Sequence, residues 1–184
     1  MTTDATHIRA KALVYAEVLL EAAKASDKVF AITGEFDELL ATVRGSFDLR
    51  NALTDPAVSP EAKKAIVAEV FDGFAPELLS TFDVMVDRGD ISALSRAHEN
   101  YIELAEKALD AVIMDVTTVV PLDDSLRQQI ISKYSAQFGS GVLLREHIDS
   151  SLIGGIVLST HGKRIDASVS SQLENARHTL SKTY

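Results

Sequence analysis

The chain has 184 residues, of which 46% are hydrophobic and 24% charged, a composition typical of packed globular domains and not of disordered or fibrous proteins. It contains no cysteine, which excludes disulfide frameworks and thiolate metal sites. The net charge of −9 lies in residues 1–110, where 20 acidic residues outnumber 11 basic ones, while residues 111–184 are balanced; this argues against nucleic acid and anionic lipid as partners.

The first part of the chain predicts a series of helices, because apolar residues recur there at helical spacing. Ser59, Pro60 and Glu61 form a strong helix start, since they combine a capping hydroxyl, a proline at the first helical position and an acid near the positive end of the helix dipole. The expected helices cover residues 8–23, 29–43, 47–53, 60–71, 76–87 and 91–109. Short connections between them predict a six-helix bundle over residues 1–110.

Near residue 110 the pattern changes to shorter segments that mix strands with helices. Residues 112–120 are β-branched and apolar, which is typical of a strand. The expected elements are strands over 112–120, 142–148, 152–159 and 164–166, a helix over 121–138, a tight turn at 161–163 and a last helix that begins at Ser168. The fold class is therefore predicted to be α+β, with an N-terminal helical bundle at 1–110 and a small C-terminal α/β module at 111–184.

No set of residues combines a nucleophile, a base and an oxyanion site, so we expect no catalytic, cofactor or metal site. The histidines form no metal-binding pair, and His98 lies on the apolar stripe of its helix, as a core or boundary histidine does. Gly154 and Gly155 lack the spacing of a phosphate loop and are interpreted as a pair that lets backbones pack closely in a sheet. Asp123 and Asp124 are interpreted as a helix start.

The lengths of the apolar segments and the N-terminal pattern predict a protein that does not enter a membrane. The longest strongly apolar segment, residues 152–158, contains two glycines and falls well short of the ~20 residues of a membrane-spanning helix. The N-terminus has neither the pattern of a signal peptide nor that of a transit peptide, so a bacterial cytoplasmic product is expected. Glu35, Asp37 and Glu38 are interpreted as a solvated helix face.

Residues 149–173 read Asp-Ser-Ser-Leu-Ile-Gly-Gly-Ile-Val-Leu-Ser-Thr-His-Gly-Lys-Arg-Ile-Asp-Ala-Ser-Val-Ser-Ser-Gln-Leu. This apolar strand with a glycine pair, a glycine turn and an Ile-Asp-x-Ser-Val helix entry resembles the C-terminal signature of the delta subunit of ATP synthases, called the oligomycin-sensitivity-conferring protein in mitochondria. Residues 85–91 and the Tyr15-Ala16 pair are similar to the same family. Asp90 stands at a position that is often basic in that family.

The resemblance implies a non-catalytic stator connector of the F-type ATP synthase, which couples proton-driven rotation to ATP synthesis. It implies that the helical part grips N-terminal helices of the alpha subunits and that the C-terminal part holds the b subunits of the peripheral stalk, at the cytoplasmic face of the bacterial plasma membrane. A groove between two helices can bind a third amphipathic helix, and we expect it between the first and fifth helices. The expected contacts are Tyr15, Leu19, Phe82, Met85 and Val86 for alpha, and Leu173 and Leu180 for the stalk.

Two other functions stay open from the residues alone. A free-standing adaptor could use the acidic helical part to bind an amphipathic helix of an unrelated partner. A small hydrolase could use the scattered acids and histidines, but it requires a titratable cluster in a cleft, which the sequence does not show. Co-purification with alpha, beta and b subunits distinguishes the stator function from both.

Overall fold

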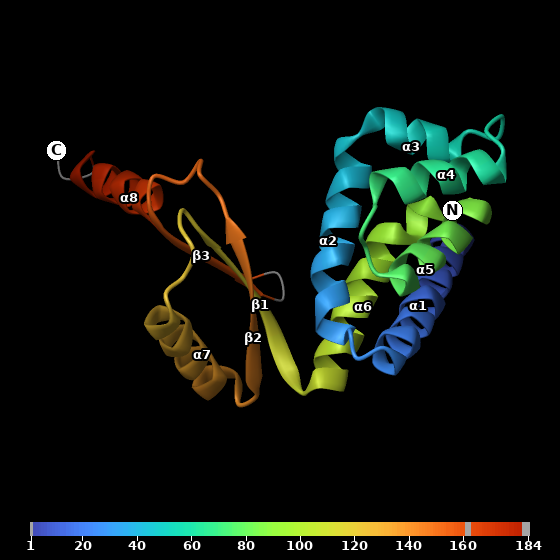
Figure 1. Cartoon of the computed structure of the whole chain (residues 1–184). Coiled ribbons are helices and arrows are strands. Elements are labelled where there is room, and N and C mark those ends of the chain that lie inside the picture. Colours follow the sequence, from blue (N-terminus) through green and yellow to red (C-terminus); the bar gives the residue numbers. More distant parts are fainter. Residues whose placement is uncertain (1, 161–162, 182–184) are drawn as a thin grey trace. The chain divides into compact units, whose positions relative to one another are not determined.

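The computed structural model describes residues 2–160 and 163–181, with side chains described for 6–160 and 163–178. The chain divides into two compact units, Met1–Leu109 and Asp110–Tyr184. The first unit contains helices and the second a sheet with two helices, which confirms the predicted α+β class (Figure 1). The division falls at Asp110, a residue in the left-handed region with φ 49°, where the apolar pattern of the sequence changes.

The elements of the first unit are α1 (Thr2–Ala25), α2 (Val29–Gly45), α3 (Phe47–Thr54), α4 (Pro60–Val70), α5 (Pro76–Asp87), the 3-10 helix η1 (Ile91–Ala93) and α6 (Leu94–Leu109). The helix predicted from residue 91 therefore begins as a 3-10 turn. Gly89 adopts φ 69° and ends α5, and the amide of Ala93 then donates to the carbonyl of Asp90 at 2.8 Å, which is the i to i+3 bond of a 3-10 helix.

The predicted helix start at Ser59 is confirmed. The Ser59 hydroxyl accepts a hydrogen bond from the amide of Ala62 at 3.2 Å, and Pro60 is the first residue of α4. The hydroxyl of Ser46 caps α3 in the same way, through the amide of Leu49 at 3.2 Å. Local sequence thus satisfies the otherwise unpaired amides at these two helix starts.

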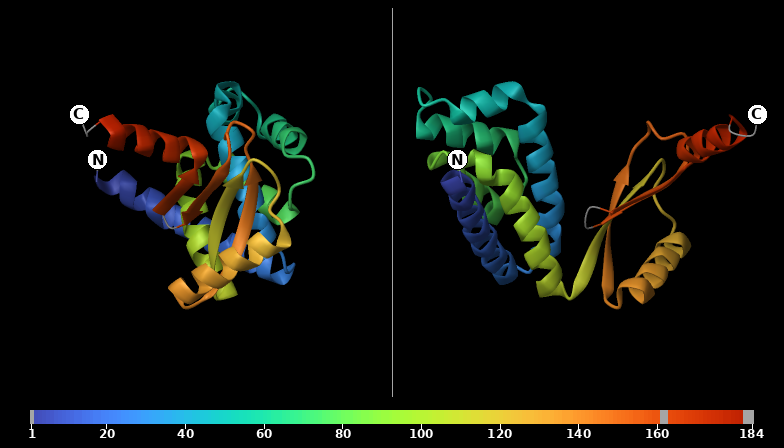
Figure 2. Two further views of the ribbon diagram at one scale, coloured as in Figure 1. Left: turned by 90° about the vertical axis from the view of Figure 1, so that its left-hand side faces the viewer. Right: turned by 180° about the vertical axis from the view of Figure 1, so that it is seen from behind.

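Helix α6 packs against both α1 and α2 and forms the centre of the first unit (Figure 2). Its Tyr101 is fully buried, and the phenol donates a hydrogen bond to the carbonyl of Val29 at 3.0 Å. Burial raises the pKa of Tyr101, and the negative charge of Glu35 adds to this, so the hydroxyl stays a neutral donor. The ring of Phe36 lies 6.0 Å from that of Tyr101 and joins α2 to α6 through aromatic packing.

The interpretation of three neighbouring acids as a solvated face is wrong for two of them. Glu35 accepts a hydrogen bond from the amide of Ala75 at 2.6 Å and so satisfies the start of α5, where no local side chain does. Asp37 lies 2.5 Å from Nε2 of His98. Only Glu38 is exposed. The histidine meets the Phe36 ring edge-on at 5.1 Å and its side chain is 14% exposed, which confirms the prediction of a boundary histidine.

The second unit contains β1 (Ala111–Thr118), α7 (Asp124–Phe138), β2 (Gly141–Ile148), β3 (Gly155–Thr160), β4 (Lys163–Ser168) and α8 (Val169–Ser181). The sheet has the order β2-β1-β3-β4. Strands β1 and β2 are parallel, joined by α7, while β3 runs antiparallel to both β1 and β4. The turn predicted at His161 and Gly162 lies outside the described residues.

Helix α7 covers one face of this sheet and supplies Ile130 and Tyr134 to its core. The interpretation of Asp123 and Asp124 as a helix start is confirmed, since Asp123 caps the helix through the amide of Leu126 at 2.7 Å. The helix therefore begins at Asp124, later than the predicted residue 121, and it ends as predicted before Gly139, which has φ 71°. Side chains at alternate positions of the strands meet α7, as period-two alternation requires. The buried core consists of Met114, Val116, Leu122, Ile130, Tyr134, Val142 and Leu158.

Strand β3 begins at Gly155, later than the predicted start at residue 152, because a turn precedes it. Asp149 closes this turn by accepting from the amides of Ser151 and Leu152. Gly155 pairs with Ser168 of β4 and has φ 86°. A β-carbon there would lie 2.4 Å from the carbonyl oxygen of Ala167, so the predicted close backbone packing is confirmed for this glycine.

Candidate partner-binding groove

A groove of about 690 Å³ lies between α1 and α5, where the sequence placed it. It is named here the α1–α5 groove, and its lining residues are Val14, Tyr15, Val18, Ala22, Pro76, Glu77, Ser80, Thr81, Val84 and Arg88. Three of its valines are strongly exposed, Val14 at 56%, Val18 at 58% and Val84 at 42%. Exposed apolar side chains gathered in one groove are typical of a protein-binding surface.

Helical periodicity explains why these residues share the groove. Val14, Val18 and Ala22 recur every fourth residue of α1, so they lie along one side of that helix. Ser80 and Val84 of α5 and Arg88, the residue that follows α5, have the same spacing. The lining positions are therefore neighbours of the predicted contact residues along the helix, but they point in another direction.

The structure places the predicted alpha contacts mainly in the interior. Leu19, Phe82 and Met85 are each 1% exposed and Val86 is 3% exposed, so these four side chains pack inside the unit and line no open surface. Tyr15, at 7% exposure, is the one predicted contact that borders the groove. The location of the groove was anticipated, whereas the positions that stay accessible on its walls were missed. A second stripe of apolar residues beside the buried stripe, such as Val14 and Val18 on α1, is the sequence signal that could have identified these accessible positions.

At one end the groove continues to Ala10, Lys11 and Asp90. Asp90 is only 8% exposed, and its carboxylate accepts hydrogen bonds from Lys11 Nζ at 2.6 Å and from the Tyr15 hydroxyl at 2.8 Å. These bonds join the start of η1 to α1 and hold the Tyr15 ring against the groove. Asp90 therefore has two specific hydrogen-bond partners, Lys11 and Tyr15, which the sequence alone did not reveal.

Several groups determine the charge state of this cluster. Burial alone would raise the pKa of Asp90, but hydrogen bonds from Lys11 and Tyr15 and the charges of Lys11 and Arg88 outweigh it and hold the pKa below its usual value. Burial raises the pKa of Tyr15, and Asp90 raises it further. At neutral pH the cluster therefore consists of an ionised carboxylate with two charged or polar donors.

Replacing Asp90 by asparagine should lower stability above pH 3.8, the ordinary aspartate value, and matter less below it. Because the folded pKa is lower than the unfolded one, the ionised carboxylate stabilises the fold above the unfolded pKa, and this contribution disappears as pH falls through the folded pKa. The expected loss at neutral pH is about 1–3 kcal/mol. Urea unfolding of both proteins at several pH values measures it; a pH-independent difference would contradict the assignment.

The second unit carries an exposed apolar surface of its own. Val120, at 66% exposure, and Leu126, at 41%, border a groove that also contains Gly154. The amide of Val169 donates to the Gly154 carbonyl at 2.9 Å, which places the first turn of α8 beside this groove. The position of Val169 thus extends the surface toward α8.

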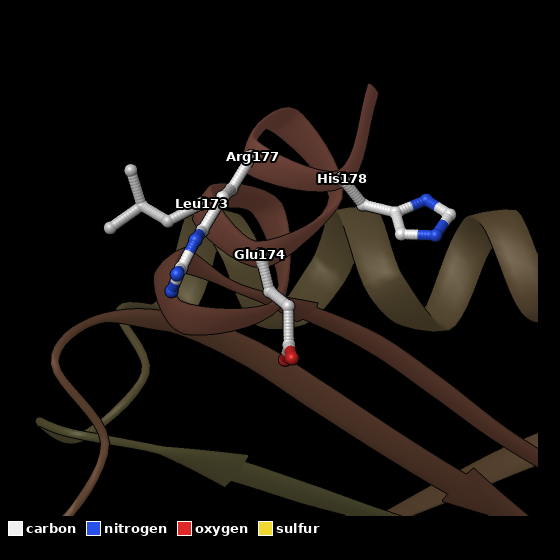
Figure 3. A pocket seen from close by; sticks show the side chains of 4 residues that line it. All are labelled: Leu173, Glu174, Arg177 and His178. Atoms are coloured by element: carbon white, nitrogen blue, oxygen red, sulfur yellow. The ribbon is translucent and has the colours of Figure 1, made fainter. Parts of the chain in front are cut away.

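The predicted stalk contact Leu173 is 61% exposed, one helical turn beyond Val169. It shares the outer surface of α8 with Glu174, Arg177 and His178, and Figure 3 shows its side chain extending away from the helix. The side chain of Leu180, the other predicted stalk contact, lies outside the described residues. We name Val120, Leu126, Ile153, Val169 and Leu173 the unit-2 apolar surface.

Polar groups in the second unit pair across strands. Arg145 of β2 donates to both carboxylate oxygens of Asp115 on β1, at 2.8 and 2.9 Å, and His147 lies 3.2 Å from the same carboxylate. Asp115 and Arg145 face each other in the strand register, so this ion pair supports the parallel pairing of β1 and β2. Across the described ranges 2–160 and 163–181, three or more metal-binding side chains do not gather at any point.

The fold and these surfaces define an α+β protein of two units, each with an exposed apolar area suited to contact with another protein. The chain belongs to the ATP synthase delta (OSCP) subunit family, whose model matches residues 12–180. The family resemblance seen in the sequence is thereby confirmed. In the described part of the chain, each helix is too short or too polar to span a bilayer.

Individual relatives agree with this family. The chain is 34% identical over 168 residues to ATP synthase subunit delta of Microcystis aeruginosa, with 90% of this chain and 92% of the relative covered. It is 32% identical over 166 residues to the same subunit of Christiangramia forsetii, with 90% of each covered. A chain in the Toxoplasma gondii mitochondrial ATP synthase hexamer matches with a TM-score of 0.53 over 92% of this chain and 96% of that one; at 17% identity it supports the fold alone.

Proposed function

We propose that this chain is the stator connector of an F-type ATP synthase, joining the alpha–beta head to the b subunits of the peripheral stalk. Its role is mechanical, with no catalytic step of its own: it keeps the head from turning with the rotor, so that proton-driven rotation yields ATP. Family membership over residues 12–180 supports this function. The open α1–α5 groove, bordered by three exposed valines, is the structural observation that carries it.

The groove suits an N-terminal helix of an alpha subunit. From Lys11 to Ala22 its lining on α1 extends for roughly 17 Å at 1.5 Å per residue, or about three helical turns. An amphipathic helix of that length presents apolar residues every third or fourth position, which can pack between Val14, Val18 and Val84. We propose that Tyr15 contacts the bound helix. The other predicted contacts are buried and pack in the core beneath the groove; they are Leu19, Phe82, Met85 and Val86.

The unit-2 apolar surface is proposed to bind the stalk. Five exposed apolar residues from the β1–α7 connection, α7, the loop before β3 and α8 contribute to it. A helical partner could cover several of them together, and covering Leu173 and Val120 would remove two of the most exposed apolar side chains of the unit from water. This extends the predicted stalk contact from α8 toward the sheet.

A connector that bears torque needs slow release from both partners. Nanomolar binding, about −12 kcal/mol, is the expected scale for each contact because affinity differences arise mainly in the dissociation rate. Two separate units that bind the head and the stalk also gain effective concentration in the assembled enzyme. The proposed location is the cytoplasmic face of the bacterial membrane, reached through the complex and not by insertion.

Co-purification from the native organism tests this function. A tagged wild-type chain should bring down alpha, beta and b subunits together. Leu173→Asp should reduce the recovery of b at least about fivefold and leave alpha and beta unchanged, because a charge at an apolar contact is costly to bury. Mass spectrometry of the isolated complexes measures this.

The matched control is Gln172→Asp, which adds the same charge on another side of α8 and should leave all three partners in place. A complex without alpha, beta and b would refute the stator function and favour the free-standing adaptor. Equal loss of b in both variants would remove Leu173 from the stalk contact.

A further inference from the structure

We propose that Asp83 makes the packing of helix α4 on α5 sensitive to pH: an ionised Asp83 weakens this contact, and a protonated Asp83 strengthens it. The two helices lie side by side in the first unit (Figure 1). Asp83 and Asp87 lie one helical turn apart on α5, and Asp87 Oδ2 lies 3.0 Å from Lys64 Nζ of α4, so both carboxylates face α4. Asp83 does not line the α1–α5 groove.

The carboxylate of Asp83 is partly buried without a hydrogen-bond donor. Its Oδ1 atom is shielded from solvent, and in the described part of the chain this oxygen accepts no hydrogen bond. Lys64, the cation that acts on Asp83, forms its ion pair with Asp87 instead. A buried charge that has lost its hydration and gains no hydrogen bond is costly, and a neutral carboxyl in the same place costs less. Ionisation of Asp83 therefore opposes the packing of α4 on α5.

The charged groups around Asp83 do not offset this cost. Lys64 of α4 attracts the carboxylate and Asp87 of α5 repels it, while Glu61 of α4 acts on Lys64 as well. Helix α1 also packs against α5, but in the described part of the chain it contributes no charged group that acts on Asp83. Burial is the largest influence and raises the pKa of Asp83 above its ordinary value of 3.8, so the folded unit binds this proton more readily than the unfolded chain does.

Helix α4 is held weakly enough for one carboxylate to affect it. Of its 11 residues, all of which are described, Val67 alone is buried, whereas α5 buries four. The ion pair between Lys64 and Asp87 is partly exposed on both sides, at 51% and 34%, and exposed pairs contribute little to stability. Elements with few buried contacts open locally at the lowest free-energy cost. The charge state of Asp83 is therefore a substantial part of what decides how firmly α4 is attached.

The direction of the pH effect follows from the direction of this shift. Because the folded pKa of Asp83 lies above the unfolded one, its contribution to stability is fully present below pH 3.8 and disappears as pH rises through the folded pKa. Acidification through this range should therefore strengthen the attachment of α4. Asp90, whose folded pKa is lowered, has the opposite dependence, so the two acids of the same unit are distinguishable by the sign of their pH effects.

Asp83→Asn tests the proposal, because asparagine keeps the shape of the side chain and removes its charge. At neutral pH the variant should slow amide hydrogen exchange in α4, around Val67, about three- to tenfold relative to the wild-type chain. This ratio should fall toward one as pH is lowered through the folded pKa of Asp83, once both proteins are corrected for the intrinsic exchange rate. Mass spectrometry of the full chain measures the exchange. A ratio of one at neutral pH, or a ratio that does not change with pH, would overturn the proposal.

A charge control and a direct titration complete the test. Glu38→Gln removes one negative charge from an exposed position of α2 and should leave exchange in α4 unchanged. Equal slowing in Glu38→Gln and Asp83→Asn would assign the effect to net charge and overturn the role of Asp83. NMR titration of the Asp83 carboxyl carbon in the wild-type chain should give a midpoint above 3.8, and a midpoint at or below that value would also contradict the proposal.

Discussion

Val18→Asp and Val84→Asp are expected to weaken binding of the alpha N-terminal peptide at least about 30-fold while leaving the thermal unfolding midpoint nearly unchanged. Both valines are exposed in the free chain, at 58% and 42%, so an aspartate there meets water and costs the fold little. In the complex the same carboxylate would be covered by an apolar helix face without a partner, which is costly. Titration calorimetry and thermal unfolding measure the two effects.

Two further variants test the reasoning behind this expectation. Val70→Asp alters an equally exposed valine, at 45%, on α4 and away from the groove, and should leave peptide affinity unchanged. Met85→Asp should unfold the first unit, because the side chain is 1% exposed and a buried unpaired charge costs several kcal/mol. If Val70→Asp weakens binding as much as Val18→Asp, the groove is not the binding site.

Gly155→Ala is expected to destabilise the second unit by about 3–5 kcal/mol, a large part of the stability of a small domain. The new β-carbon would lie 2.4 Å from the carbonyl oxygen of Ala167 and 2.8 Å from Cα of Ser168, which are backbone atoms of a paired strand and cannot rotate away. The residue also has φ 86°, a conformation that alanine disfavours. Hydrogen exchange of the β1 and β3 amides measures the loss.

Gly139→Ala separates the two causes. Gly139 has φ 71° at the end of α7, but no atom lies within 4 Å of a β-carbon built there. This variant should therefore cost only the conformational penalty, about 1–2 kcal/mol. Equal losses in Gly139→Ala and Gly155→Ala would show that steric exclusion by β4 contributes nothing.

Local chemistry made much of the fold predictable. Hydroxyl, proline and glycine signals act over a few residues, so Ser59, Asp123 and Gly139 marked helix limits that the structure confirms. The change of period near residue 110 separated helices from strands. The missed features, such as the 3-10 turn at residues 91–93 and the late start of β3, depend on hydrogen bonds in turns that periodicity does not describe.

The contact residues were harder to predict because apolar character does not distinguish a core from an interface. Leu19 and Val18 are adjacent and both apolar, yet one is 1% and the other 58% exposed. The sequence shows apolar residues on two faces of α1. Only one of these faces is covered, and the helices that cover it, α5 and α6, lie far from α1 in the sequence. Glu35 illustrates the same limit, since the amide that it satisfies at Ala75 is remote in sequence.

The amino-acid sequence by itself determined the helical or extended period of the main elements, the helix starts at Ser59 and Asp123, and the family signature. These depend on neighbours a few residues apart or on a local pattern of residue types. Only the tertiary structure decided which side of α1 and α5 stays open and which partners surround Asp90. Burial is a property of the whole packing arrangement: a side chain leaves water when another element covers it, and α6 covers the side of α1 that carries Leu19 while the side that carries Val18 remains accessible.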